Sequence, residues 1–371
     1  MRIAIIGAGL SGCTIARLLK DRGHGVVIFE KEKMPGGLCR TDVHEGKLYQ
    51  LFGSHNLHTR NEKVIEFVRR FSEFNHYLHR VRTFVDGKTF PYPISYKTIE
   101  LLKEKDRILK EISCLPKKMD ESNFESCVVS MVGESIYKKF IENYTRKFWG
   151  LSPREMDAEW APKRIEIRQD DSLGYFKDEW QGLPVKGYTH MFEKMIEGIP
   201  IHYEKEIKGY RNLGYDLVVS TVPIDELFDF CYGRLAYRGL DFMMHFNESE
   251  WEDAQYGCIN FPDNDVAYIR KCNYSLCYPN GPITSYIVGY DFPSNHNRMY
   301  PVYTSANKKL FNQYLARLVR IKNLLSIGRL GLFRYYDMDE AIEWCLDHID
   351  AVENYPALNP EEKVELLTKV R

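Results

Sequence analysis

A glycine-rich turn near the start of the chain constrains the fold more than any other feature. Residues 2–6 form a short apolar run rich in β-branched side chains, which predicts a buried strand. The sequence Gly7-Ala8-Gly9-Leu10-Ser11-Gly12 follows, and residues 13–22 then have helical spacing of apolar positions. A second apolar run, 26–29, ends at Glu30. Strand, G-x-G-x-x-G turn, helix, strand and acidic residue in this order predict a dinucleotide-binding βαβ unit.

Each position of this unit has a physical role in holding a dinucleotide. Gly7 allows the tight turn, Gly9 lets the backbone approach a pyrophosphate, and Gly12 lets the helix and strand pack closely. The helix N-terminus, which includes Ser11, supplies amide donors and the positive end of the helix dipole. Glu30 can accept hydrogen bonds from ribose hydroxyls and disfavours a 2′-phosphate. A glycine-rich turn with no ligand is the alternative.

Composition and charge limit the class of protein. The chain has 371 residues with 51 basic and 52 acidic side chains, and this near-neutral balance argues against nucleic acid as the main partner. No apolar run reaches the roughly 18 residues of a membrane span. Nine scattered cysteines with no C-x-x-C pair, and no signal-peptide pattern, predict reduced free thiols, a cytoplasmic location and no metal site.

A second glycine pair distinguishes FAD from NAD. Residues 30–40 read E-K-E-K-M-P-G-G-L-C-R, with the pair just past the acidic residue. The stretch resembles FAD proteins of the glutathione-reductase and amine-oxidase superfamily, where such a pair allows close approach of the flavin's pyrophosphate and ribityl chain. The resemblance implies FAD, with Lys31, Gly37 and Leu38 beside it. A surface loop with two glycines is the alternative.

The remaining segments predict two insertions into the nucleotide-binding domain. Residues 81–90 alternate like a hairpin, helical periodicity dominates from about 96 to 148, and 240–291 show the short alternating stretches of an antiparallel sheet. Runs at 215–221 and 324–328 predict strands that return to the first sheet, and helices are expected at 61–72 and 308–320. The last helix of the chain is expected at 337–349, capped by Asp337.

The predicted fold class is therefore α/β, with three parts. A discontinuous Rossmann-like FAD-binding domain comprises 1–90, 185–235 and 305–371, an inserted helical subdomain comprises 91–165, and an antiparallel β-sheet subdomain comprises 166–184 and 236–304.

Five further patterns occur in one order along the chain. They are F-G-S-H-N-L-H-T at 52–59; Y-T-R-K-F-W-G at 144–150; K-R-I at 163–165 with Y-F at 175–176 and G-L-P-V-K-G-Y-T at 182–189; N-F at 260–261 with Y-I-R at 268–270; and M-Y-P-V at 299–302 with G-R-L-G-L-F-R-Y-Y-D-M at 328–338. Together with the FAD signature, this order resembles the bacterial UDP-galactopyranose mutases over residues 1 to about 350. The resemblance implies an enzyme that converts UDP-galactopyranose to UDP-galactofuranose with no net redox change.

The resemblance also implies the residues of the site. In the family, N5 of the reduced flavin attacks the anomeric carbon of the sugar and expels UDP. Arg164 and Arg270 would hold the diphosphate, and His58 would aid protonation at N5. Flavin contacts would come from His55, Asn56, Leu57, Arg329, Asp337 and Met338. Substrate contacts would come from Tyr144, Thr145, Trp149, Tyr175, Asn260, Tyr300 and Tyr335. The competing interpretations are surface arginines and a core-anchoring role for Trp149.

Departures from the family pattern leave the sugar open. The family element F-N-x-P-F-N is F-P-Y-P-I-S at 90–95, Leu38-Cys39 stands where Asn-Ala is usual, and Ser54 replaces Ala. Since the family's Asn adjoins the sugar, UDP-N-acetylgalactosamine, another nucleotide-activated hexose or another base are alternatives. A FAD-dependent amine or polyene oxidase would explain the N-terminal signature without the arginine–tyrosine cluster. A third alternative is a protein that binds FAD without turnover.

Two expectations concern partners. The chain has no second G-x-G-x-x-G, so an external reductant such as NAD(P)H is expected to act without a dedicated motif. The resemblance implies a homodimer through the helical subdomain, although the apolar stripe at 123–148 would serve equally as core.

Overall fold

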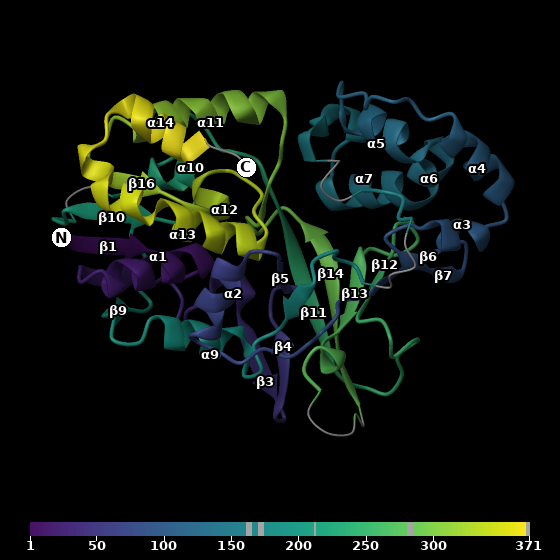
Figure 1. Ribbon diagram of the computed structural model, residues 1–371, viewed down its shortest axis with the longest axis horizontal. Helices are drawn as coiled ribbons and strands as arrows, with labels where there is room; N and C mark the ends of the chain where they lie inside the picture. Colours follow the sequence, from purple (N-terminus) through teal and green to yellow (C-terminus); the bar gives the residue numbers. More distant parts are fainter. Residues whose placement is uncertain (161–164, 170–173, 211–212, 280–282, 284, 369–371) are drawn as a thin grey trace.

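The computed structural model describes residues 1–160, 165–169, 174–210, 213–279, 283 and 285–368 of the chain. Figure 1 shows a sheet with flanking helices at the left, a cluster of helices at the upper right, and a second sheet between and below them. Segments from the start, middle and end of the chain meet in the first sheet. The first region is therefore discontinuous in sequence, as predicted.

The first sheet has five parallel strands in the order β16-β10-β1-β2-β9. Their bounds are Leu324–Ser326 for β16, Leu217–Ser220 for β10, Arg2–Ile6 for β1, Gly25–Phe29 for β2 and Ile201–His202 for β9. β1 is central, and its residues from Ile3 to Ile6 are buried, which is typical of a parallel strand covered on both faces. The strands predicted around 2–6, 26–29, 215–221 and 324–328 are confirmed.

Helices pack around this sheet. α1 (Leu10–Asp21) begins within the glycine-rich turn and packs against α13 (Met338–Asn354) and α9 (Gly187–Met195). Asp337 caps α13 in a capping box with Glu340, as predicted. The expectation that this helix is the last was wrong, because α14 (Pro360–Thr368) follows it. The other helices here are α2 (Glu62–Arg69), α10 (Ile224–Leu227), α11 (Ser305–Leu318), α12 (Gly328–Gly331), η1 (Gly37–Cys39) and η6 (Tyr355–Ala357).

The second sheet has seven strands in the order β15-β11-β14-β13-β12-β6-β7. All neighbours pair antiparallel except β12 and β6. The bounds are Tyr300–Pro301 for β15, Tyr237–Glu248 for β11, Tyr286–Ser294 for β14, Arg270–Asn273 for β13, Cys258–Asn260 for β12, Val81–Val85 for β6 and Lys88–Tyr92 for β7. A short turn of helix, η5 (Tyr274–Leu276), follows β13.

The pairing places two predicted boundaries differently. The hairpin β6–β7 belongs to the second sheet, because β6 pairs with β12, and not to the FAD-binding segment 1–90 in which it was expected. Among the described residues of 166–184, none belongs to a strand of the second sheet. They contain β8 (Trp180–Gly182), which pairs with β5 (Leu57–Thr59), and near the first region a further hairpin joins β3 (Thr41–His44) and β4 (Lys47–Gln50).

The helical region has its own apolar core, which includes Ile99, Ile108, Phe124, Cys127, Val128, Ile136 and Phe140. Its elements are α3 (Tyr96–Glu100), α4 (Lys105–Ser113), α5 (Phe124–Val132), α6 (Glu134–Ile136), the π-helical segment η2 (Tyr137–Glu142), α7 (Asn143–Trp149), η3 (Pro153–Glu155) and η4 (Ala158–Trp160). Gly150 ends α7 in a left-handed conformation, with φ of 69°. The apolar stripe at 123–148 therefore faces this core.

One expectation about the cysteines was wrong. Cys258 and Cys272 are directly opposite each other on β12 and β13, and they form a disulfide. The pairing follows from strand register, which the scattered positions of the cysteines along the chain do not reveal. Seven other cysteines are free thiols.

Among the described helices, none combines the length and apolar character needed to cross a membrane.

Candidate functional site

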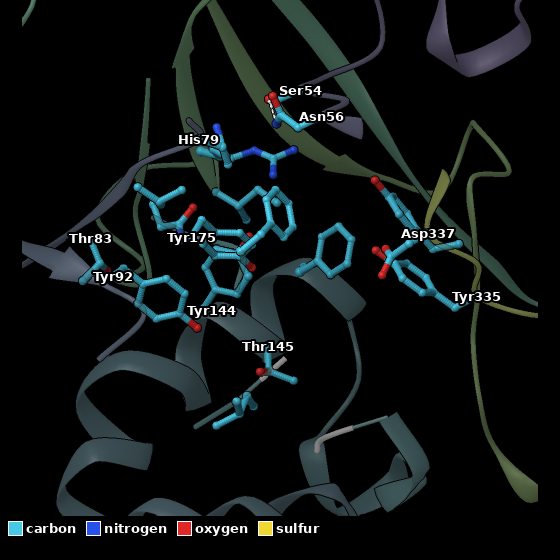
Figure 2. A pocket seen from close by; sticks show the side chains of 18 of the residues that line it. Ser54, Asn56, His79, Thr83, Tyr92, Tyr144, Thr145, Tyr175, Tyr335 and Asp337 are labelled. Carbon is cyan, nitrogen blue, oxygen red and sulfur yellow. Dashed lines mark hydrogen bonds between the residues drawn. The ribbon is translucent and has the colours of Figure 1, made fainter. Parts of the chain in front are cut away.

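A cavity of about 250 Å³ lies where loops and helices of the first region, the second sheet and the helical region meet. Figure 2 shows Ser54 and Asn56 at one side of it, Tyr335 and Asp337 at another, and Thr145 below. Fourteen of the residues predicted for the site line this cavity: His55, Asn56, His58, Tyr144, Thr145, Trp149, Tyr175, Asn260, Arg270, Tyr300, Arg329, Tyr335, Asp337 and Met338. Residues from five separate motifs are thus brought together.

Some predicted residues lie elsewhere. Leu57 on β5 has no exposed surface and belongs to the large apolar core. Leu38 packs against the small cluster of Leu240, Ile269 and Met299, which forms part of the cavity wall. Arg164 lies outside the described residues, so its role stays a prediction.

A row of side chains crosses the second sheet beneath the cavity. Strand register pairs Thr83 with Asn260, Asn260 with Arg270, and Arg270 with Asp291. Because directly opposed residues project to the same face, the row presents polar groups to one space. Thr83, Asn260 and Arg270 all line the cavity.

Asp291 holds the Arg270 side chain in position. Its Nε donates to Asp291 Oδ2 at 2.7 Å, and its Nη2 lies 2.6 Å from the same oxygen. Asp291 has no exposed surface, whereas the Arg270 side chain is 23% exposed. Burial alone would lower the pKa of Arg270, but the Asp291 carboxylate holds that pKa above its usual value. The guanidinium therefore stays charged, with Nη1 turned away from the carboxylate contact.

Aromatic rings form a wall beside the second arginine of the cavity. Tyr300 and Tyr335 stack with centroids 6.0 Å apart, and the Arg329 guanidinium lies 5.3 Å and 4.8 Å from their ring centroids. Arg329 Nη2 also donates to the Tyr336 carbonyl at 2.7 Å. Burial raises the pKa of Tyr300 and of Tyr144, so both hydroxyls keep the proton that they can donate.

The loop before β5 holds a neutral histidine. His55 Nδ1 lies 3.0 Å from the Gly53 carbonyl. Burial, with the nearby charges of Arg329 and Arg270, lowers the pKa of His55 to about 4. At neutral pH the ring is therefore uncharged beside two arginines.

His58 has a carboxylate partner. Its Nδ1 lies 2.6 Å from Asp178 Oδ2, and its ring stacks on Phe176 with centroids 3.6 Å apart. Phe176 lines the cavity with it. The antiparallel pairing of β5 with β8 brings the segment that carries Asp178 alongside His58.

The glycine-rich turns form a cradle that fits a dinucleotide. Gly7 has φ of 99°, and a side chain there would lie 2.2 Å from the Thr221 hydroxyl. A Cβ on Gly37 would lie 3.1 Å from the Cα of Gly9, and one on Gly328 would lie 3.0 Å from the Ser11 hydroxyl. Three chain segments therefore approach one another at the N-terminus of α1, where backbone amides can contact phosphate oxygens.

The acidic residue of the cradle is oriented by backbone amides. Glu30 Oε2 accepts from the Ala8 amide at 2.6 Å, and Oε1 accepts from the Glu32 amide at 2.9 Å. Each carboxylate oxygen keeps a further lone pair for a ribose hydroxyl. Lys31, by contrast, is exposed.

Four residues that complete the site carry no recognisable signal in the sequence: Thr83, Asp291, Asp178 and His79. Asp291 and Asp178 are ordinary acidic residues in sequence, and Thr83 lies in a hairpin. Each is placed by strand pairing over long separations. His79 is buried, and burial with the charges of Arg270 and His58 lowers its pKa to about 3. A histidine at the end of a loop carries no local pattern that reveals this.

Comparison with known proteins identifies the family. The family model for UDP-galactopyranose mutase matches residues 139–335, and that for an NAD(P)-binding Rossmann-like domain matches residues 5–71. A probable UDP-galactopyranose mutase of Klebsiella pneumoniae is 31% identical over 368 residues, covering 94% of each chain. The chain belongs to the UDP-galactopyranose mutase family. A dTDP-fucopyranose mutase of Escherichia coli is 30% identical and covers 93% of this chain and 97% of its own.

A solved structure from this family shares the fold. A crystal structure of reduced UDP-galactopyranose mutase has a TM-score of 0.81 and 20% sequence identity, with 99% of both chains covered. Because the relatives named above are mutases, this member of the UDP-galactopyranose mutase family is an isomerase. An L-amino-acid oxidase of Crotalus adamanteus matches 56% of this chain and 44% of its own, at 25% identity. The oxidase alternative therefore has only distant support.

Proposed function

We propose that the protein interconverts the pyranose and furanose forms of a nucleotide-activated hexose. UDP-galactopyranose and UDP-galactofuranose are the first candidate pair, and a close nucleotide sugar such as UDP-N-acetylgalactosamine is an alternative. The observation that carries the proposal is Arg270, half-buried, charged and fixed by the buried Asp291 in a cavity that also contains Arg329 and a wall of tyrosines. An anion clamp of this kind suits a diphosphate leaving group and not the apolar site of an amine oxidase.

A second candidate is a dTDP-activated deoxyhexose. The dTDP-fucopyranose mutase of Escherichia coli is as similar to this chain as the relatives named for UDP-galactopyranose, at 30% identity. The departure at 90–95 also supports a different sugar, because Tyr92 from that element lines the cavity.

The residues of the cradle fit FAD as the cofactor. Gly9, Gly37 and Ser11, which lie close together at the N-terminus of α1, would hold the pyrophosphate, and Glu30 would accept hydrogen bonds from a ribose. Arg329, Asp337 and Met338 would adjoin the ring system at the cavity. Reduced FAD would supply a nucleophilic N5 for the anomeric carbon, with an external donor such as NAD(P)H keeping it reduced.

The chain's own residues would bind and retain the leaving group. Arg270 neutralises the diphosphate while the bond from its oxygen to the sugar is broken and later re-formed. Tyr300 and Tyr335 would donate hydrogen bonds from their hydroxyl groups to phosphate oxygens. Because Asp291 fixes the guanidinium, the clamp needs little reorganisation during the reaction.

The apolar residues of the helical region would hold the base and exclude water. Phe140, Ile141, Phe148 and Trp149 line that end of the cavity. A ring stacked among them would be oriented by Tyr144 and Thr145. Keeping bulk water out protects a displaced sugar from hydrolysis.

The experiment uses the purified flavoprotein reduced with dithionite under argon. UDP-galactofuranose, UDP-N-acetylgalactosamine and a dTDP-fucose are incubated separately, and pyranose is resolved from furanose by chromatography. Interconversion that requires reduced flavin but consumes no stoichiometric reductant is expected. Oxygen consumption with an amine substrate, without any ring interconversion, would overturn the proposal in favour of the oxidase.

A further inference from the structure

His58 is held with one ring nitrogen occupied and the other open. Nδ1 is bound to Asp178 at 2.6 Å, and the ring is stacked on Phe176. Within the described part of the chain, Nε2 has no hydrogen-bond partner. His58 and Phe176 both line the cavity, whereas Asp178 does not. The arrangement therefore places the carboxylate behind the ring, as seen from the cavity.

Asp178 is itself fixed in place. Its Oδ1 lies 3.0 Å from Arg60 Nε, and its backbone carbonyl accepts from Gln181 Nε2 at 2.9 Å. The Arg60 side chain is 68% exposed, so its ion pair contributes little to stability. The His58 side chain is only 11% exposed, so the hydrogen bond between its ring and Asp178 is better shielded from solvent than the Arg60 ion pair.

The chemistry of the two groups determines which nitrogen carries hydrogen. A carboxylate accepts hydrogen bonds and does not donate them, so the nitrogen that faces it must be Nδ1–H. In the neutral ring this leaves the lone pair on Nε2.

We propose that Asp178 is a positioning residue: its carboxylate holds His58 in the Nδ1–H form and turns Nε2 toward the cavity, where Nε2 exchanges a proton with the bound cofactor or substrate. This inference rests on the proposed function and adds to it a residue that acts through His58.

A second carboxylate near His58 provides an internal comparison. Asp339, in the first turn of α13, interacts with His58 through charge, and no hydrogen bond joins it to the ring. Burial raises the pKa of Asp339 to about 6, against the opposing effect of His58. The charged and titratable groups around the ring are Asp178, Arg60, Asp339, Asp337 and His79. If only negative charge near the ring mattered, removing either carboxylate would change the protonation of His58 and the turnover to a similar extent.

The experiment compares Asp178→Asn, Asp178→Glu and Asp339→Asn in the FAD-loaded enzyme, with Glu179→Gln as the matched control. Glu179 is the exposed neighbour of Asp178, and its substitution makes the same change in charge. Long-range proton–nitrogen NMR on ¹⁵N-histidine-labelled protein reports which imidazole nitrogen is protonated, and the His58 signals are identified by their loss in His58→Gln. Turnover is measured with the sugar nucleotide that the wild-type enzyme converts.

The expected result separates position from charge. Asp178→Asn should lose the Nδ1–H signature of His58 and lower kcat at least about tenfold with little change in KM, as expected for a group in proton transfer. Asp178→Glu should recover the signature and part of kcat, while Asp339→Asn should keep the signature. In a His58→Gln background, Asp178→Asn should have no further effect on kcat, because Asp178 acts through the ring.

Two results would overturn the inference: an unchanged Nδ1–H signature in Asp178→Asn, or a loss of kcat by Asp178→Asn that is as large without His58 as with it. Failure of the wild-type enzyme to convert any of the sugar nucleotides would instead contradict the proposed function. The NMR arm does not depend on turnover, so the two failures are distinguishable. Thermal unfolding of each variant checks that it folds, and Asp178→Glu keeps the test decisive if Asp178→Asn does not.

Discussion

At the scale of single residues, the site depends on pairs that the strand register creates. Arg270 and Asp291 are opposite each other on β13 and β14, and Phe242 on β11 continues the same row. Gly53 lies against the row, because a Cβ there would be 3.0 Å from the Phe242 ring and 3.5 Å from Arg270 Nη2. The backbone at Gly53, in the loop that carries His55, thus lies so close to Arg270 that a larger residue would crowd it.

Gly53→Ala should therefore reduce kcat/KM by more than the accompanying loss of stability explains. The residue has φ of 82°, so alanine costs about 1–2 kcal/mol of unfolding free energy for the backbone alone. Gly87→Ala is the matched control, since Gly87 has φ of 72° and a Cβ there would meet nothing within 4 Å. Urea unfolding should show similar losses in both variants, while kcat/KM falls about tenfold or more only in Gly53→Ala. Equal activities in the two variants would contradict the contact.

Buried histidines make stability depend on pH. The pKa of His79 is lowered to about 3 by burial and by the charges of Arg270 and His58, from 6.5 in an exposed ring. Below pH 6.5 the unfolded chain binds a proton that the folded chain does not, so the free energy of unfolding falls as the pH falls toward 3. The His55 pKa of about 4 acts in the same direction.

His79→Gln should weaken this dependence. Between pH 7 and pH 5, the His79 contribution to the free energy of unfolding should decrease by about 2 kcal/mol, at 1.36 kcal/mol per pH unit below 6.5. Urea titrations of wild type and variant at both pH values measure it. The variant should lose about 2 kcal/mol less than the wild type over this interval, and parallel losses would refute the assignment.

At the scale of elements, local patterns were predictable and pairings were not. The order β1, α1, β2 follows from periodicity, glycines and the acid at the strand end, all within about thirty residues. The hairpin β6–β7 was also visible in sequence, but its sheet was not, because β6 joins β12 far along the chain. For the same reason, the sequence reveals neither the pairing of Asp291 with Arg270 nor the disulfide between Cys258 and Cys272, because strand register sets both. The resemblance to a family supplied the cavity residues that periodicity could not.

One motif residue acts between elements. Lys147 on α7 donates from Nζ to the carbonyls of Asp263, Val266 and Tyr268, the last two at 3.1 Å. These carbonyls belong to the connection between β12 and β13, the strands that carry Asn260 and Arg270. The ammonium thus joins the helical region to the sheet at the cavity edge.

Lys147→Met should loosen that connection. It leaves the three carbonyls without the ammonium, so the free energy of unfolding should fall by about 1–3 kcal/mol. Hydrogen exchange in residues 261–269 should become faster, and kcat/KM should fall because Arg270 begins β13. Arg146→Gln is the control, since it removes the neighbouring exposed ion pair with Glu142, worth at most about 1 kcal/mol. Unchanged exchange in Lys147→Met would contradict the role.

At the scale of the whole molecule, the cavity is a junction of three regions. Arg329 and Asp337 come from the C-terminal part of the first region. Arg270 and Tyr300 come from the second sheet, and Trp149 comes from the helical region. A nucleotide diphosphate bound there would contact all three regions. Ligand that binds the folded state alone stabilises it in proportion to the logarithm of its concentration.

UDP should therefore raise the melting temperature, and the rise should require Arg270. At 100 times Kd, binding adds about 2.7 kcal/mol, which corresponds to a shift of several degrees in a chain of this size. Arg270→Ala should lose most of that shift at the same UDP concentration while keeping the spectrum of bound flavin. Lys271→Ala is the control, because strand alternation turns Lys271 to the opposite face, where its Nζ lies 3.0 Å from Glu252. If both variants kept the shift, the diphosphate would have to bind away from the polar row of the second sheet, and the proposed clamp would be wrong.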